Sequence, residues 1–219
     1  MVEIYDPQEQ DKVVKKWLAE NGSAIVMGLV IAFGGLFGFK QWQSWQVSNR
    51  QQASAEFEVV SELLTEGQLD SAMANFQNLQ DNYSNSPYAS LTALQMAKAR
   101  LDASQPDLAI SLYQFVVDNG HPKALSVVAR VRLARVFLDQ GRADEALSLL
   151  QDTTDISGFE SRFAEVKGDI YFSQNKIDEA ITAYQEALET LEVGVGDRAT
   201  LVLKLESLGA DIPEDGNQS

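Results

Sequence analysis

The segment Asn175-Lys176-Ile177-Asp178-Glu179-Ala180, with Tyr184 four residues further on, occurs in four related versions along this chain. In each version an Asp stands two residues before an Ala, and a large apolar residue stands four residues after that Ala. The alanines are 37, 37 and 34 residues apart: Ala72, Ala109, Ala146 and Ala180. A recurrence at this spacing indicates an array of similar supersecondary units.

The spacing within each version predicts two helices joined by a short turn. The Asp is expected near a helix start, where its carboxylate can cap free amides and interact with the helix dipole. The Ala is small because a second helix crosses there, and the large residue one turn later lies on the same face. A small residue and an aromatic also precede the Ala by twelve and nine residues, as Gly168 and Tyr171 do before Ala180.

These offsets resemble the consensus of the tetratricopeptide repeat. Ala134 and Phe137 match it in the third version, whereas Arg100 replaces the aromatic in the second and the first is degenerate. The resemblance implies an all-α solenoid, because a single helix pair cannot bury its apolar face alone. The helix pairs and a final capping helix are expected at about 53–85, 88–119, 123–154, 158–192 and 197–208.

A candidate membrane anchor precedes the repeats. Ala24 to Phe39 reads AIVMGLVIAFGGLFGF, sixteen residues without a charge, and a transmembrane helix needs about 20. Its four glycines argue against a soluble core helix, and it lacks the polar face of an interfacial helix. An acidic leader and a poor cleavage site argue against a signal peptide. Interfacial aromatic residues are expected on both sides of the span: Trp17, Trp42 and Trp45.

The basic residues set the expected orientation. Three lysines precede the span, at positions 12, 15 and 16, and Lys40 and Arg50 follow it, which favours a cytoplasmic N-terminus. The repeats would then lie outside, in the periplasm of a bacterium. The expected organisation is a cytoplasmic segment, a transmembrane helix, a repeat domain and a disordered tail, at 1–21, 22–43, 44–208 and 209–219.

Small residues recur within the span, including Gly28, Gly34 and Gly38. Small residues let helices approach closely in lipid, so these glycines are candidates for packing on another membrane helix or on a second copy. Compositional preference for glycine in membrane helices explains them equally well.

The composition excludes several kinds of chemistry. A net charge of −15 argues against nucleic acid as a partner. The chain has no cysteine and no phosphate-binding loop. Its one histidine, His121, sits in the turn-like sequence Asn119-Gly120-His121-Pro122. We therefore expect no enzyme activity, cofactor, metal or small-molecule substrate.

Stacked helix pairs create a concave surface lined by the first helix of each pair. The consensus offsets place apolar residues and a few charges on this surface, which suits an extended or helical peptide. The residues expected there are Leu94, Lys98, Leu101, Val131, Arg135, Leu138, Glu165, Asp169 and Phe172. Lys98 and Arg135 would be isolated positive sites able to bind a carboxylate, although burial by the C-terminal helix or by neighbours remains an alternative for some of these residues.

The whole chain is similar to the YfgM family, the ancillary subunits of the SecYEG translocon in Gram-negative inner membranes. The resemblance rests on the anchor, the repeats and an N-terminal motif: Glu3-Ile4-Tyr5, Glu9-Gln10, Val14-Lys15-Lys16-Trp17, Asn21-Gly22, then Trp42 and Gln46-Val47 after the span. It implies a single-pass type II membrane protein that associates with SecYEG and with PpiD, a membrane-anchored periplasmic chaperone.

The resemblance further implies roles beside other periplasmic chaperones and in envelope stress. We therefore expect a non-catalytic translocon subunit that scaffolds chaperones and assists secreted or outer-membrane proteins at the translocon exit. An envelope-assembly or stress-signalling adaptor on the same scaffold remains the alternative, because unrelated adaptors share these repeats.

Overall fold

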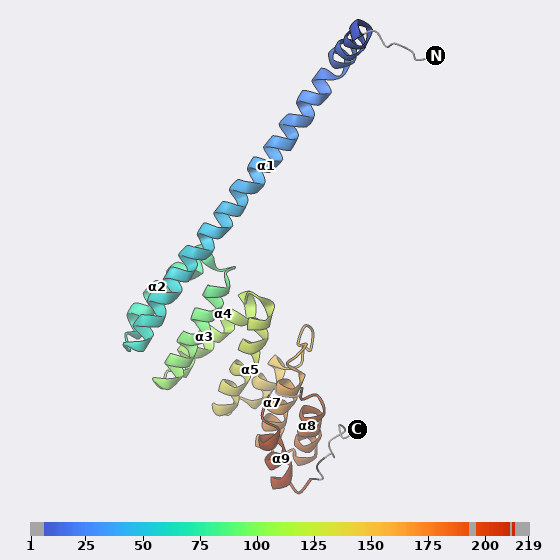
Figure 1. Ribbon diagram of the computed structural model, residues 1–219. Helices are drawn as coiled ribbons and strands as arrows, with labels where there is room; N and C mark the ends of the chain where they lie inside the picture. The colour runs from blue at the N-terminus through green and yellow to red at the C-terminus, as the bar shows by residue number, and fades with distance from the viewer. Residues whose placement is uncertain (1–6, 193–195, 211, 213–219) are drawn as a thin grey trace. The chain divides into compact units, whose positions relative to one another are not determined.

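The computed structural model describes residues 7–192, 196–210 and 212, which form two compact units, 1–51 and 52–219. Every regular element in these described ranges is a helix, which confirms the expected all-α class (Figure 1). The helices are α1 (Pro7–Thr65), α2 (Leu69–Tyr83), α3 (Pro87–Asp102), α4 (Pro106–Asn119), α5 (Lys123–Asp139), α6 (Ala143–Leu149), α7 (Glu160–Ser173), α8 (Ile177–Glu189) and α9 (Arg198–Ser207). Most of the expected tail, 209–219, lies outside the described residues.

The first unit consists of the N-terminal part of α1. Among the described residues, no single straight helix is long and apolar enough to cross a membrane. Two parts of α1, Lys15–Ala24 and Val26–Thr65, meet at a bend of 43° and together satisfy both requirements by length and composition. This pair is therefore the candidate span, at the place where the sequence predicts one.

The large apolar side chains of this segment are exposed, from 52 % for Leu29 to 74 % for Phe37. An exposed apolar stretch of this length is unfavourable in water. A Cβ atom built on Gly28, Gly34 or Gly38 would meet nothing within 4 Å. Small-residue packing at these glycines would therefore need a second helix.

The second unit repeats one turn four times, between the first and second helix of each pair. One turn residue adopts a left-handed conformation in every case: Gly67, Ser104, Gly141 and Asn175, with φ of 74°, 58°, 73° and 61°. The amide that follows closes the turn on the first helix, as when Arg142 N–H donates to the Phe137 carbonyl at 2.8 Å. Glycine and asparagine tolerate this conformation best, and every turn residue except Ser104 is one of these two types. The four turn residues recur at the same spacing as the alanines.

The repeated aspartates lie inside the second helices rather than at their caps. The residues at the N-caps of α2, α4, α6 and α8 make no side-chain capping bond: Gln68, Gln105, Arg142 and Lys176. Each Asp is the second residue of its helix, as Asp107 is in α4. There its negative charge interacts favourably with the positive end of the helix dipole.

The predicted crossing positions are confirmed. The four repeat alanines are fully buried, and successive helices pack on one another from α2 to α9. At the α7–α8 crossing, a Cβ built on Gly168 would lie 2.5 Å from ring atoms of Tyr184. Only a residue without a side chain allows this approach.

Arg100, which replaces the expected aromatic in the second pair, is only 5 % exposed. In the third and fourth pairs an aromatic of the first helix lies beneath a cation from the turn, with Arg142 4.2 Å from the Phe137 ring centroid. In the second pair the cation lies on the first helix instead of in the turn, and Arg100 donates to the turn residue Gln105 at 2.7 Å. It also donates to the Leu69 carbonyl at 3.1 Å, so this cation joins two neighbouring pairs.

We predict that Gly168→Ala lowers the free energy of unfolding by about 1–2 kcal/mol, because overpacking against Tyr184 outweighs the higher helix propensity of alanine. Urea unfolding followed by circular dichroism measures the change. A double-mutant cycle provides the control, since a smaller side chain in Tyr184→Leu should relieve most of the cost. An equal cost in both backgrounds would contradict the crossing argument.

Candidate partner-binding face

The first helices of successive pairs, α3, α5 and α7, lie next to one another in a row, because α5 contacts both α3 and α7. Residues three, four and seven positions apart share one side of a helix. The accessible apolar and basic residues on the shared side form what we call the first-helix face. Its members are Leu91, Lys98, Leu101, Val128, Arg132, Arg135, Leu138, Arg162 and Phe172. By the same spacing, three accessible acids lie on this side as well: Asp102, Asp139 and Asp169.

The residues that the sequence predicts for this surface differ in how far they are exposed to solvent. Leu94, Val131 and Glu165 are buried, at 5 %, 7 % and 8 % exposure, and the first two belong to the hydrophobic core. Lys98 and Phe172 are exposed, and four more are partly buried: Leu101, Arg135, Leu138 and Asp169. Contact with a partner is therefore open to the exposed and partly buried members, whereas Leu94 and Val131 contribute packing.

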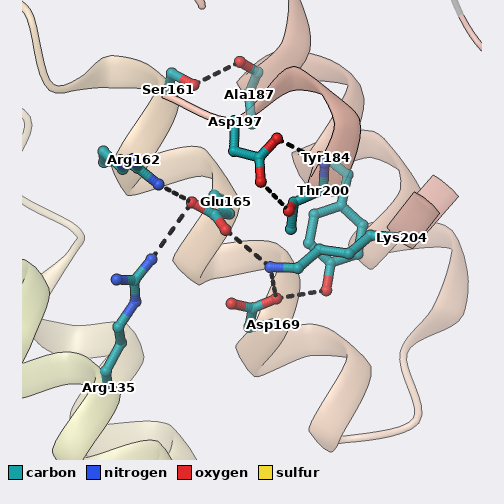
Figure 2. A network of polar contacts seen from close by, with 10 residues as sticks. All are labelled: Arg135, Ser161, Arg162, Glu165, Asp169, Tyr184, Ala187, Asp197, Thr200 and Lys204. Carbon is teal, nitrogen blue, oxygen red and sulfur yellow. Dashed lines mark hydrogen bonds and ion pairs between the residues drawn. The ribbon is translucent and has the colours of Figure 1, made fainter. Parts of the chain in front are cut away.

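Glu165 is the centre of a polar network (Figure 2). Arg162 Nη1 donates to its Oε2 atom at 2.9 Å, and Arg135 Nη2 donates to the same atom at 3.3 Å. Lys204 Nζ, from α9, donates to Oε1 at 2.9 Å. One carboxylate thus connects α5, α7 and α9.

Asp169, one turn after Glu165, extends the network to α8. Lys204 Nζ and the Tyr184 hydroxyl both donate to its Oδ1 atom at 2.7 Å. The Lys204 ammonium also lies 5.3 Å from the centroid of the Tyr184 ring. Both carboxylates are thus bonded within the chain and hold the C-terminal helix.

The pKa values follow from these contacts. Burial acts to raise the pKa of Glu165, but the hydrogen bond and charge of Lys204, together with Arg162 and Arg135, outweigh it and hold the pKa below its ordinary value. Burial, followed by donation to Asp169, raises the pKa of Tyr184. Glu165 is therefore ionised and Tyr184 neutral near pH 7.

Sequence reasoning missed four members of the face: Leu91, Val128, Arg132 and Arg162. Arg162 lies one turn before Glu165, and Arg132 lies one turn before Arg135, so helical spacing extended by a turn would have found both. Helical spacing does not identify Arg130. Its guanidinium donates to the Leu149 carbonyl at 2.9 Å and lies 4.9 Å from the Phe163 ring centroid, joining two repeats.

The comparison with known families assigns the architecture. The family model described as "Tetratricopeptide repeat-like domain" matches residues 15–210, which is most of the chain. The chain belongs to this tetratricopeptide repeat-like family. The repeat fold expected from the alanine spacing is thereby confirmed, and so is the solenoid character of the second unit.

Curated relatives of this tetratricopeptide repeat-like chain are named "Ancillary SecYEG translocon subunit". The Escherichia coli (strain K12) protein is 31 % identical over 102 residues, covering 46 % of this chain and 48 % of that protein. The Aggregatibacter actinomycetemcomitans protein is 33 % identical over 104 residues, covering 47 % and 50 %. The matches thus span about half the length of these relatives and about half of this chain, and over that half they confirm the resemblance seen in the sequence.

Among solved structures, "MamA 41-end from Desulfovibrio magneticus RS-1" is 16 % identical, with a TM-score of 0.49, covering 72 % of this chain and 93 % of that chain.

Within the described part of the chain, no three His, Asp or Glu side chains are grouped so that they could hold a metal ion. His121 is exposed in its turn, and its backbone N–H donates to Ser90 Oγ at 3.0 Å.

We predict that Glu165→Gln lowers the free energy of unfolding at pH 7 by about 1–2 kcal/mol, because three charge-assisted bonds are weakened. The folded-state pKa of Glu165 is below 4.5, so its stabilisation is present above pH 4.5 and is lost as pH falls through that lower pKa. Urea unfolding of the unsubstituted chain and the variant at pH 7 and about pH 3 measures the difference between their free energies of unfolding. This difference should be smaller at the acidic pH.

The exposed Glu186 provides the control for this prediction, since Glu186→Gln should change the stability little at either pH. A gap that stays constant between the two pH values would show that Glu165 acts through packing rather than charge.

Proposed function

We propose that this chain is a non-catalytic accessory subunit of the inner-membrane protein translocon, SecYEG. Its repeat domain would scaffold periplasmic chaperones, including a PpiD-like membrane-anchored one, and assist secreted or outer-membrane proteins at the translocon exit. The observation that carries the proposal is the similarity to ancillary SecYEG translocon subunits in a chain whose repeat family serves protein interaction. The first-helix face supports it, because it exposes apolar and charged side chains together on adjacent helices.

The proposed topology assigns a place to each part of the chain. Residues 1–21 would lie in the cytoplasm, 22–43 would cross the inner membrane, and 44–208 would form the periplasmic domain, followed by the tail, 209–219. Gly28, Gly34 and Gly38 would pack against a translocon helix, because small residues let helices approach closely in lipid.

We expect photocrosslinking in cells to capture partners from the first-helix face. A photoreactive residue at Leu101, Leu138 or Phe172 should yield products with translocon subunits or with a membrane-anchored chaperone, identified by mass spectrometry. Accessible positions on the second helices, Gln77 and Thr182, serve as matched controls.

Capture of translocon subunits from the face, and not from the controls, supports the proposal. Recovery of envelope-assembly factors alone would favour the alternative adaptor function. Products from the controls but from none of the three face positions would overturn the assignment of the face.

The absence of cysteine allows the topology to be tested with single-cysteine variants. We expect a membrane-impermeant maleimide to label Ser111→Cys in spheroplasts, whereas Lys12→Cys should react only after permeabilisation. The protein should also stay in the membrane pellet after alkaline carbonate extraction. The opposite labelling pattern would reverse the orientation, and extraction by carbonate would exclude the span.

A further inference from the structure

The helix α9 depends on docking to stay helical. It has ten residues, and an isolated helix of this length is marginal in water even with favourable residues. Two of its residues are buried, Leu201 and Leu205. Helix formation in α9 is therefore coupled to its contacts with the last pair, and a change that weakens these contacts also destabilises the helix.

The apolar cluster beneath α9 is separate from the main core. It joins one residue of α7, four of α8 and two of α9: Ala164, Ala180, Tyr184, Ala187, Leu188, Leu201 and Leu205. The main core ends at α7, where Phe163, Val166 and Ile170 belong to it, and no residue of α9 takes part in it. Loss of α9 would therefore uncover the small cluster and leave the main core covered.

Lys204 attaches α9 to α7 through two carboxylates. Its Nζ atom donates to Glu165 at 2.9 Å and to Asp169 at 2.7 Å. The side chains of Lys204 and Asp169 are each 26 % exposed, and that of Glu165 is 10 % exposed. Salt screens partly buried pairs much less than exposed ones, so protonation of the carboxylates is the change that breaks this attachment.

Charged groups from three helices and from the N-cap of α9 meet at this junction (Figure 2). The carboxylates are those of Glu165, Asp169 and Asp197, and the cations are Arg135, Arg162 and Lys204. The Tyr184 hydroxyl of α8 donates to Asp169 at 2.7 Å and stays neutral. Three negative groups thus balance three positive ones, and protonation of the carboxylates would leave an excess of positive charge between α5, α7 and α9.

The direction of the pH dependence follows from two of the carboxylates. Burial acts to raise the pKa of Glu165, but Lys204, Arg162 and Arg135 hold it below its ordinary value of 4.5. Asp197 accepts from the Thr200 N–H at 3.2 Å, and its hydrogen bonds with Thr200 lower its pKa. A depressed pKa in the folded state means that the stabilisation is complete above the ordinary pKa and is lost as the pH falls through the folded-state value.

We propose that α9 is an acid-sensitive latch: protonation of Glu165 and Asp169 releases Lys204, and α9 leaves the last pair while the rest of the stack stays folded. Opening would uncover Tyr184 and Leu188 at the C-terminal end of the stack, next to cations that have lost their counter-charges. The domain thereby gains an apolar surface in acid that it lacks at neutral pH. This inference concerns the fold alone and does not depend on the translocon proposal.

Distance measurements by pulsed electron paramagnetic resonance test the opening, because the chain has no cysteine of its own. Spin labels on Thr182→Cys and Ser207→Cys, at exposed positions of α8 and α9, report on the latch. Labels on Ser111→Cys and Ser148→Cys, at exposed positions of α4 and α6, report on the rest of the stack. In the full chain in a nonionic detergent, we expect the latch pair to lose its narrow distance peak between pH 7 and about pH 3.5. The reference pair should keep its peak.

Substitutions at the junction should open the latch at pH 7. Lys204→Met keeps the apolar stem of the side chain and removes its charge, so the latch pair should be broad at pH 7 and change no further in acid. Glu165→Gln/Asp169→Asn imitates protonation and should have the same effect at pH 7. The matched control is Glu186→Gln/Glu189→Gln, which removes two charges from exposed positions of α8. It should keep the narrow peak at pH 7 and lose it in acid.

Three outcomes would overturn the inference. Broadening of both pairs at the same pH would show acid unfolding of the whole domain instead of a latch. A latch pair that stays narrow down to about pH 3 would show that apolar contacts alone hold α9. An open latch at pH 7 in the Glu186/Glu189 control would show an effect of net charge. The reference pair reports in each variant whether the stack is folded, and the crosslinking and topology experiments on the translocon proposal are unaffected by all of these results.

Discussion

The close approach of helices at the repeat crossings is the contact on which the rest of this domain depends. A helix pair by itself leaves one apolar side uncovered, so each pair is stable only when the next pair covers it. The approach requires small residues, and the buried repeat alanines and Gly168 beneath Tyr184 meet that requirement. The left-handed turn residues reverse the direction of the chain at the equivalent position of every pair.

Among the described residues, a single helix rather than another pair follows α8. Here α9 covers the last pair with Leu201 and Leu205, which are 3 % and 0 % exposed. Lys204 of the same helix reaches back to Glu165 and Asp169 on α7. The cap is therefore held by apolar burial together with a charged network, and that network occupies two carboxylates that would otherwise face a partner.

The same architecture separates two chemical surfaces. The second helices carry no Lys or Arg, whereas the first helices α3 and α5 carry more basic than acidic residues. Each second helix carries an Asp in its first turn, where the negative charge interacts favourably with the positive end of the helix dipole. The first helices place Lys98, Arg132 and Arg135 beside exposed apolar groups.

The sequence by itself determined the repeat fold, the crossing alanines, the capping helix and the candidate membrane segment. These follow from local rules, since helix periodicity, turn residues and apolar runs depend on neighbours along the chain. The tertiary structure alone decided that Leu94 and Val131 are buried, that Arg100 links two pairs, and that Glu165 is neutralised by cations. The last of these depends on residues 30 and 39 positions away, Arg135 and Lys204. Such pairings are set by the distances between packed helices, which a repeat pattern does not specify.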